Sequence, residues 1–225
     1  MPDAHPRFPV GTRLPRAHEV LVLTVVAAAC STPGRVGSSQ AGEADTSAVV
    51  EIAPVATCHW RAEAAELAER LSPPDSVRFS IGDAEALLCY SRPSARGRVM
   101  IGGDRVPYGE VWRTGANEPT TLHLGFAADI AGVRVDPGTY TLYTVPRPGV
   151  WEIIVNRSTE QWGAERYYTS AIEAMEAGRG AAPAHATDAH VETLRFRVAL
   201  VAADTVHLTL EWEGTQLPIP IRRLR

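Results

Sequence analysis

The sequence contains no lysine, because all 22 basic residues are arginine. A chain without lysine cannot form a lysine Schiff base, use a lysine as general base or supply the lysine of a Walker-type phosphate loop. The G-x-S-x-G motif of serine hydrolases and the H-E-x-x-H motif of zinc proteases are also absent. These absences exclude several common enzyme classes and indicate no particular reaction.

Strong charge of one sign is lacking as well. The chain has 26 acidic residues against its 22 arginines, for a formal net charge of −4. Proteins that bind nucleic acid concentrate basic charge on one surface. We therefore expect no nucleic-acid partner, and no motif in the sequence calls for a cofactor.

No apolar run is long enough to cross a bilayer, which takes about 20 residues. Residues 20–29, VLVLTVVAAA, follow Arg7, Arg13 and Arg16 and end in three alanines. A basic leader, a short apolar core and small residues are typical of a secretory signal. We predict a signal peptide over residues 1–29.

Cys30 directly follows the three alanines, which resembles the lipobox of bacterial lipoproteins. We expect lipidation at Cys30, and the membrane is then contacted through the lipid anchor alone. Residues 30–56 are rich in Gly and Ser and predict a flexible tether. Ser31 behind the cysteine predicts sorting to the outer membrane and a periplasmic location. A plain secretory signal and an uncleaved anchor are the alternatives.

Only two further cysteines are present, Cys58 and Cys89. In an oxidising compartment they predict a disulfide. Two unpaired thiols, or a metal site that also uses His59, are the alternatives.

The spacing of apolar residues changes along the chain from a helical to a strand period. A face formed by Trp60, Ala64, Leu67 and Leu71 predicts a helix over residues 57–74, which Pro73 and Pro74 end. From residue 75 to residue 225, short alternating segments separated by turns predict a mainly β domain, an antiparallel sandwich or barrel. The expected strands are 77–81, 84–90, 98–101, 120–124, 133–135, 139–145, 150–156, 194–200, 206–212 and 217–221.

Three details of the C-terminal half follow from single residues. Ser170 and Glu173 form a capping box for a short helical insertion that Gly178 would end, which makes residues 179–190 a surface loop. In this loop His185, Asp188 and His190 form an H-x-x-D-x-H pattern, read either as metal ligands or as solvated side chains. Gly214 predicts a turn before the last strand. Pro218 and Pro220, which lack an N–H, predict that this strand lies at a sheet edge.

Several blocks of residues occur in the order found in one protein family. They are YSRPS at 90–94, GR at 97–98, PYG at 107–109, VWRTGANE at 111–118, GTYTL at 138–142, QWG at 161–163 and LEW at 210–212, with Trp151 and Asn156. In these blocks the chain resembles the domain-of-unknown-function 2911 family over roughly residues 72–221. The resemblance implies an exported β-rich domain and carries over no activity. Residues 167–189 depart from the family pattern, and the helix before Ser72 lies outside it.

The most concentrated set of chemical groups lies in residues 106–121. Their aromatic, cationic, amide and acidic side chains surround two glycines and predict a binding site for a small polar or anionic molecule. Its expected residues, with Arg92 as a helper, are Arg92, Tyr108, Trp112, Arg113, Asn117 and Glu118. Arg113 would bind the anionic group, and Trp112 or Tyr108 would stack on the ligand.

A structural interpretation of the same block competes with this one. Gly115 would supply a positive φ, Asn117 would cap backbone groups, and Arg113 would pair with Glu118. Two other functions also remain open. Glu118 is a weak candidate for a catalytic general base in a hydrolase, with Asp104 and His123 nearby in sequence. A structural or assembly protein of the cell envelope would instead recruit a partner through residues 216–221. The three Trp residues 151, 162 and 212 are interpreted as core or as sugar-binding platforms.

Overall fold

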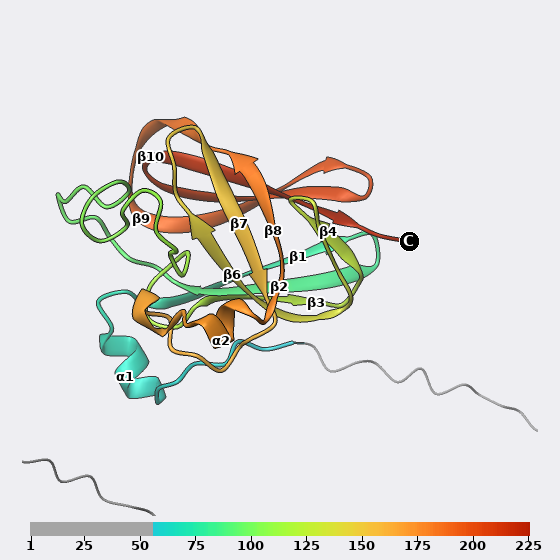
Figure 1. The fold of residues 1–225 in the computed structure, drawn as a ribbon, viewed down its shortest axis with the longest axis horizontal. Coiled ribbons are helices and arrows are strands. Elements are labelled where there is room, and N and C mark those ends of the chain that lie inside the picture. Colours follow the sequence, from blue (N-terminus) through green and yellow to red (C-terminus); the bar gives the residue numbers. More distant parts are fainter. Residues whose placement is uncertain (1–55) are drawn as a thin grey trace, which may run out of the picture. The chain divides into compact units, whose positions relative to one another are not determined.

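The protein forms two antiparallel β-sheets packed face to face. A computed structural model describes residues 56–225, and the predicted signal peptide, Cys30 and most of the tether lie outside these residues. Figure 1 shows the strands β1 Pro74–Ile81, β2 Ala84–Ser91, β3 Thr120–Leu124, β4 Ala128–Ile130, β5 Val133–Val135, β6 Gly138–Val145, β7 Val150–Asn156, β8 Glu176–Pro183, β9 His185–Ala202 and β10 Thr205–Arg223. The helices are α1 Ala64–Glu69, η1 Glu165–Tyr167 and α2 Ser170–Glu173. No helix in this part of the chain is long and apolar enough to cross a membrane.

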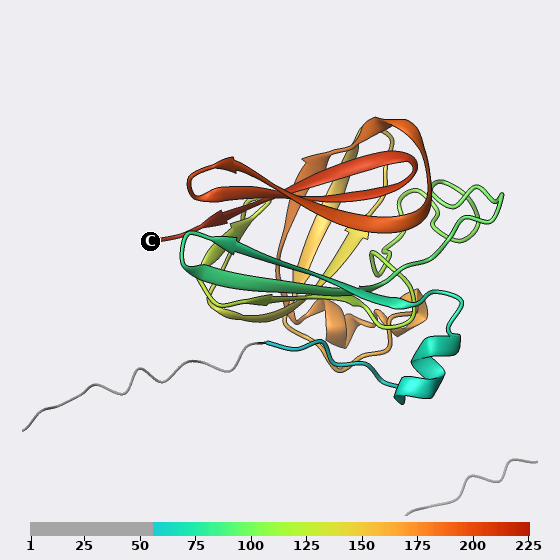
Figure 2. The ribbon, with the colours of Figure 1, turned by 180° about the vertical axis from the view of Figure 1, so that it is seen from behind.

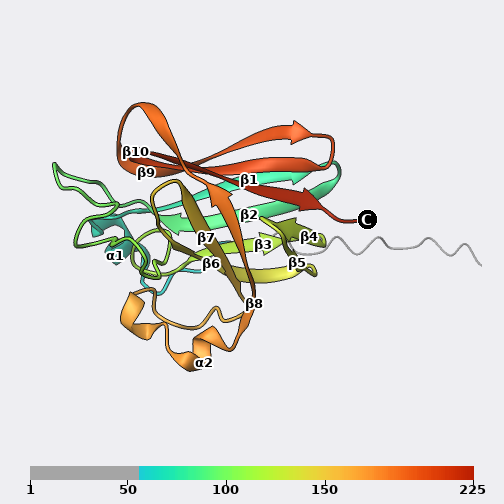
Figure 3. The same ribbon diagram turned by 45° about the horizontal axis from the view of Figure 1, so that its top comes forward.

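The six-stranded sheet has the order β1-β2-β3-β6-β7-β8 and the four-stranded sheet the order β5-β4-β10-β9. Their inner faces carry the alternating apolar side chains, such as Leu122 and Ile153 from one sheet and Leu208 and Ile219 from the other. At the sides of the sandwich, β8 lies next to β5 and β1 next to β9 (Figure 3). The predicted antiparallel sandwich is confirmed.

The alternation of apolar and polar residues predicted the bounds of most strands to within a few residues. Residues 120–124, 133–135 and 150–156 are strands with the expected bounds, and 77–81 and 84–90 form the expected hairpin. Residues 98–101 do not form a strand. Ile101 makes only an isolated bridge to Val106 within the long connection between β2 and β3.

The N-terminal helix is much shorter than expected. It spans only Ala64–Glu69, and none of its residues is buried. Cys58 is joined to Cys89 of β2 by a disulfide, with the two Cα atoms 5.6 Å apart. The Arg61 N–H donates to Glu118. These tertiary contacts hold residues 58–61 outside a helix, so the predicted apolar face does not form.

The predicted loop over residues 179–190 is wrong, because it consists of β8 and the start of β9. A Cβ added to Gly180 would lie 2.1 Å from the Ala131 carbonyl oxygen, and one added to Gly178 would lie 3.1 Å from Val133. Here the glycines permit a close approach between β8 and the β4–β5 hairpin. The capping box is also wrong, since the N-cap of α2 is Thr169 and its side chain makes no capping hydrogen bond.

The predicted turn at Gly214 and edge strand at 217–221 are wrong as well. β10 continues through both segments without ending. The pairing with β9 shifts register on either side of Glu213, whose φ is 53°. A β-bulge therefore takes the place of the predicted turn. Pro218 and Pro220 lie between the last residue paired with β9, Gln216, and the first paired with β4, Ile221. Their missing N–H groups therefore interrupt no ladder. Residues 216–221 belong to an inner strand of the sheet, which disfavours an exposed edge there that recruits a partner.

Candidate functional site

The block predicted as a binding site lies in the connection between β2 and β3, and its tryptophan faces the core. Trp112 is 3% exposed and stacks on Trp212, with ring centroids 5.8 Å apart, while its edge meets Trp151. Its indole N–H donates to the Gly115 carbonyl, and its backbone pairs with Thr144 of β6. Trp112 therefore cannot stack on a ligand. Trp151 and Trp212 are core residues too, whereas Trp162 is partly exposed.

The other members of the block have separate partners. Tyr108 is half exposed, and its ring covers Gly102, where a Cβ would lie 2.4 Å from the ring. Asn117 has a φ of 57° and donates its amide to the Ser72 carbonyl. Gly115 does not have the predicted positive φ, which Thr114 and Asn117 adopt instead. Asn117 therefore caps a backbone carbonyl, as the structural interpretation expected.

Arg113 pairs with Glu165 and not with Glu118 as expected. Its Nε lies 3.4 Å from a Glu165 carboxylate oxygen, and its Nη1 lies 3.5 Å from the Asn117 carbonyl. Burial lowers the pKa of Arg113, while the neighbouring Glu165 acts in the opposite direction. Glu165 belongs to the segment after β7 that covers Tyr143 and Ile154, so Arg113 ties this cover to the block.

Glu118 is the most buried acid of the block, with 6% of its surface exposed. Arg70 Nη1 lies 2.7 and 3.0 Å from the two carboxylate oxygens, and the Arg61 N–H donates to one of them at 3.0 Å. Burial alone would raise the pKa of Glu118, but these hydrogen bonds hold it below its ordinary value. His123 lines the same cavity as Glu118. A carboxylate with occupied oxygens and a lowered pKa is a poor general base, which disfavours the hydrolase interpretation.

The lowered pKa of Glu118 predicts a specific dependence of stability on pH. A group whose pKa is lower in the folded state stabilises the protein above its unfolded-state pKa and loses that contribution as pH falls through the folded value. We expect the difference in free energy of unfolding between wild type and Glu118→Gln to shrink from about pH 6 to about pH 3. Urea unfolding at several pH values measures it. A constant difference would show that the pair contributes no proton-linked stability.

Arg92 lies apart from Glu118. It lines a cleft of about 430 Å³ along β9 together with Arg195, Arg197 and Glu211, and its Nε is 3.4 Å from Asp75. Glu118 lines a cavity of about 180 Å³ beside the disulfide. The predicted residues thus do not form one pocket. The H-x-x-D-x-H residues lie on β9, and residues 56–225 contain no group of three or more His, Cys, Asp or Glu side chains placed to hold a metal.

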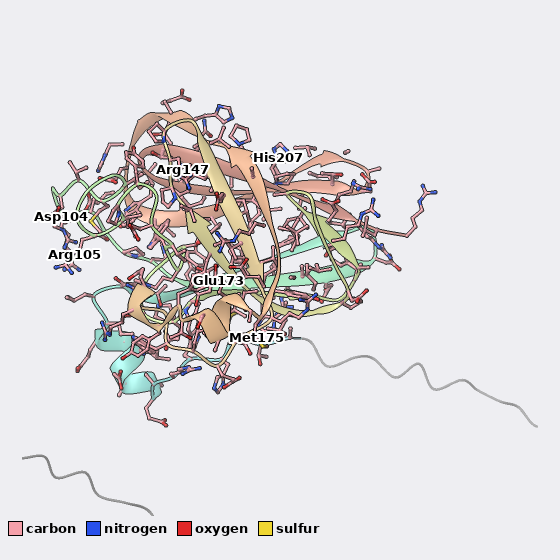
Figure 4. The ribbon with its side chains drawn as sticks, in the orientation of Figure 1. Asp104, Arg105, Arg147, Glu173, Met175 and His207 are labelled. Carbon is pink, nitrogen blue, oxygen red and sulfur yellow. A yellow bond between two sulfur atoms is a disulfide. The ribbon has the colours of Figure 1, made fainter. Side chains whose placement is uncertain are left out.

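Three arginines that the sequence analysis did not combine form a pocket of their own. Arg96, Arg98 and Arg105 line a volume of about 270 Å³, together with Leu71, Ser72, Pro93, Ser94 and Met100. No acidic residue lines it. Figure 4 shows Arg105 and Asp104 on the outlying loop between β2 and β3. One signal was available, since residues 92–109 contain four arginines and the single acid Asp104.

The guanidinium groups of this pocket are positioned by neutral partners. Arg98 donates from Nε to the Ala95 carbonyl at 2.9 Å and from Nη2 to Ser94, and Arg96 donates to the Leu71 carbonyl at 3.0 Å. Within residues 56–225, none of the three arginines forms a salt bridge. The pocket therefore combines the fixed donors of Arg96 and Arg98 with guanidinium groups that form no salt bridge in this part of the chain, and the nearest carboxylate contact is the Arg96 backbone N–H, which donates to Glu192 at 2.6 Å.

Comparison with known proteins places the domain in a family. The sequence model of a family described as "Protein of unknown function (DUF2911)" matches residues 72–221. No curated protein and no solved structure matches the chain.

Proposed function

Because the chain belongs to the DUF2911 family, whose function is unknown, its own residues must indicate its activity, and we propose that it binds a small oxyanion in the pocket of Arg96, Arg98 and Arg105. The family resemblance found in the sequence is thereby confirmed. The proposal keeps the expected small anionic ligand and moves its site from Arg113 to these three arginines.

The observation that supports this proposal is the gathering of three arginines in a pocket that no acidic residue lines and whose guanidinium groups form no salt bridge within residues 56–225. Guanidinium groups match carboxylate, sulfate and phosphate oxygens through paired N–H donors. Arg96 and Arg98 each use part of their donor set on backbone carbonyls, which fixes their orientation and leaves other N–H groups for a ligand. Fixed donors bind more tightly because less side-chain freedom is lost on binding. The volume of about 270 Å³ suits a small molecule or a single anionic group.

We further propose that the domain works in the cell envelope as a lipoprotein anchored through Cys30, on the periplasmic face of the outer membrane. The signal-like N-terminus supports this location. The disulfide between Cys58 and Cys89 fits an oxidising compartment. Metabolic labelling with a fatty acid tests it: wild type should carry the label and Cys30→Ala should not. An unlabelled wild type would favour a plain secreted protein.

Replacing Arg105 with alanine should weaken anion binding about tenfold, which corresponds to one charge-assisted hydrogen bond. Arg105 is exposed and makes no hydrogen bond or salt bridge to residues 56–225, so its loss should leave the fold unchanged. Arg98→Ala should act similarly. NMR titration of the protein with inorganic phosphate, sulfate and citrate at low salt measures the affinities.

Arg134→Ala is the matched control, because it removes the same charge from β5, where the side chain is 78% exposed. It should leave the affinities within about twofold of wild type. Loss of binding in all three variants would indicate only a general charge effect. Absence of saturable binding to wild type would reject the pocket as an oxyanion site.

A further inference from the structure

Residues 56–71, here called the N-terminal strap, lie before the part of the chain that the family model covers. The strap contains α1, which stands apart from both sheets (Figure 2). None of its residues is buried. It is attached by the Cys58–Cys89 disulfide and by polar contacts, including those of Arg78 with the Ala56 carbonyl and of Arg96 with the Leu71 carbonyl. Since none of its residues is buried, we infer that the strap can be displaced more easily than the strands of the two sheets.

Besides the disulfide, Glu118 is the residue of the family domain that accepts the most hydrogen bonds from the strap. Both carboxylate oxygens accept hydrogen bonds from the strap, from the side chain of Arg70 and the backbone of Arg61. Among residues 56–225, these are the only side-chain hydrogen bonds and salt bridge of Glu118. The family model covers Glu118 and does not cover Arg70. Without the strap, the domain would present this carboxylate just before the start of β3, without the hydrogen bonds and the salt bridge that it now makes.

The cavity beside Glu118 is closed on one side by the strap and on the other by the sheet. His59, Trp60 and Arg61 line it from the strap. Pro119, Thr121, His123 and Thr139 line it from the domain, and its volume is about 180 Å³. If the strap moved away, this cavity would open toward the part of the domain surface that Arg70 now covers. A cationic group that enters would find the carboxylate together with the Thr121, Thr139 and His123 side chains.

We propose that Glu118 is a binding site for the guanidinium or ammonium group of an external ligand, and that Arg70 occupies this site as an internal substitute. Arg70 shows the chemistry that the site accepts, because one of its nitrogens contacts both carboxylate oxygens. The disulfide keeps the strap close, so its effective concentration at Glu118 is high. An external cation then binds only to the fraction of molecules in which the strap is open, which lowers its apparent affinity by that fraction.

Chemical substitution of the Arg70 side chain tests the site in the full chain. Methylguanidinium, which reproduces the head group of Arg70, should bind Arg70→Ala saturably and at least tenfold more tightly than wild type. Adding Glu118→Gln to Arg70→Ala should abolish this binding. Arg78→Ala is the matched control, since it removes another arginine that contacts the strap but leaves Glu118 covered, and it should behave as wild type. Binding that survives Glu118→Gln would overturn the assignment.

Displacement of the strap is tested separately, without altering Arg70. In the double variant Cys58→Ser and Cys89→Ser, methylguanidinium should bind at least tenfold more tightly than to wild type. It should also increase hydrogen exchange of residues 56–71. Unchanged exchange and unchanged affinity in this variant would show a fixed structural ion pair and overturn the proposal. Arg105→Ala, which alters the oxyanion pocket, should change neither measurement, so the two proposals can fail independently.

Discussion

Replacing Trp112 with alanine is expected to lower the free energy of unfolding by about 3–5 kcal/mol, the usual range for a buried tryptophan. The indole is 3% exposed, stacks on Trp212 and meets the edge of Trp151. Removing it leaves a cavity between the two sheets and deprives the Gly115 carbonyl of its donor. Equilibrium unfolding in urea measures the loss as a lower midpoint at an unchanged slope.

Tyr167→Ala is the control for this prediction. Its ring is 42% exposed, so its removal should cost less than about 1 kcal/mol. If Trp112→Ala were as stable as Tyr167→Ala, the indole could not be packed as the structure shows. The ligand-stacking interpretation of Trp112 would then return.

Gly180→Ala is expected to destabilise the protein by about 2–3 kcal/mol, toward the upper end of the effect of inserting one methyl group into a packed site. The new Cβ would lie 2.1 Å from the Ala131 carbonyl oxygen, a contact with backbone that no change of side-chain conformation relieves. Either β8 or the β4–β5 hairpin must move, although β8 is paired with β7 along its whole length. Thermal and urea unfolding both measure the effect.

Gly214→Ala provides the matched comparison, because it makes the same substitution in another strand. No atom lies within 4 Å of a Cβ built at Gly214. The substitution should be neutral, or stabilising by up to about 1 kcal/mol through the reduced freedom of the unfolded chain. Equal losses in the two variants would mean that the cost arises from replacing glycine in a strand and not from the approach of β8 to Ala131.

Local alternation was sufficient to locate strands whose one face is buried. Thr120–Leu124 shows why, since Leu122 and Leu124 enter the core while Thr121 and His123 do not. The same reasoning failed at Gly178 and Gly180. Closely spaced glycines in a sequence are equally compatible with a loop and with a strand that approaches another segment closely. Here they allow contact with the β4–β5 hairpin, which lies some 50 residues earlier in the chain. It failed at Gly214 because a β-bulge bends a strand without ending it.

The predicted site residues do not share one pocket, and the reason is that their partners lie far away along the chain. The sequence placed Arg113 and Glu118 next to each other, but their partners are Glu165 and Arg70, which lie far away in sequence. Arg70 also contacts Glu66, four residues before it, at 3.7 Å, yet Glu118 holds Arg70 more closely, at 2.7 Å. Nor does local sequence show which way a loop tryptophan points. Trp112 points into the core, where it stacks on Trp212, a residue that lies a hundred positions later in the sequence.

The disulfide has a mechanical consequence for a domain attached through its N-terminal side. A force applied before Cys58 passes through the sulfur–sulfur bond directly to Cys89 of β2, the strand next to the edge strand β1 in the six-stranded sheet. The residues between the two cysteines, which include α1, all of β1 and the β1–β2 turn, form a covalent loop that bears no tension. Extension would therefore begin at β2 and its neighbour β3, and a force from the N-terminal side could not peel β1 from the sheet. Reduction of this one bond would transfer the tension to residues 59–73, where polar contacts alone resist it.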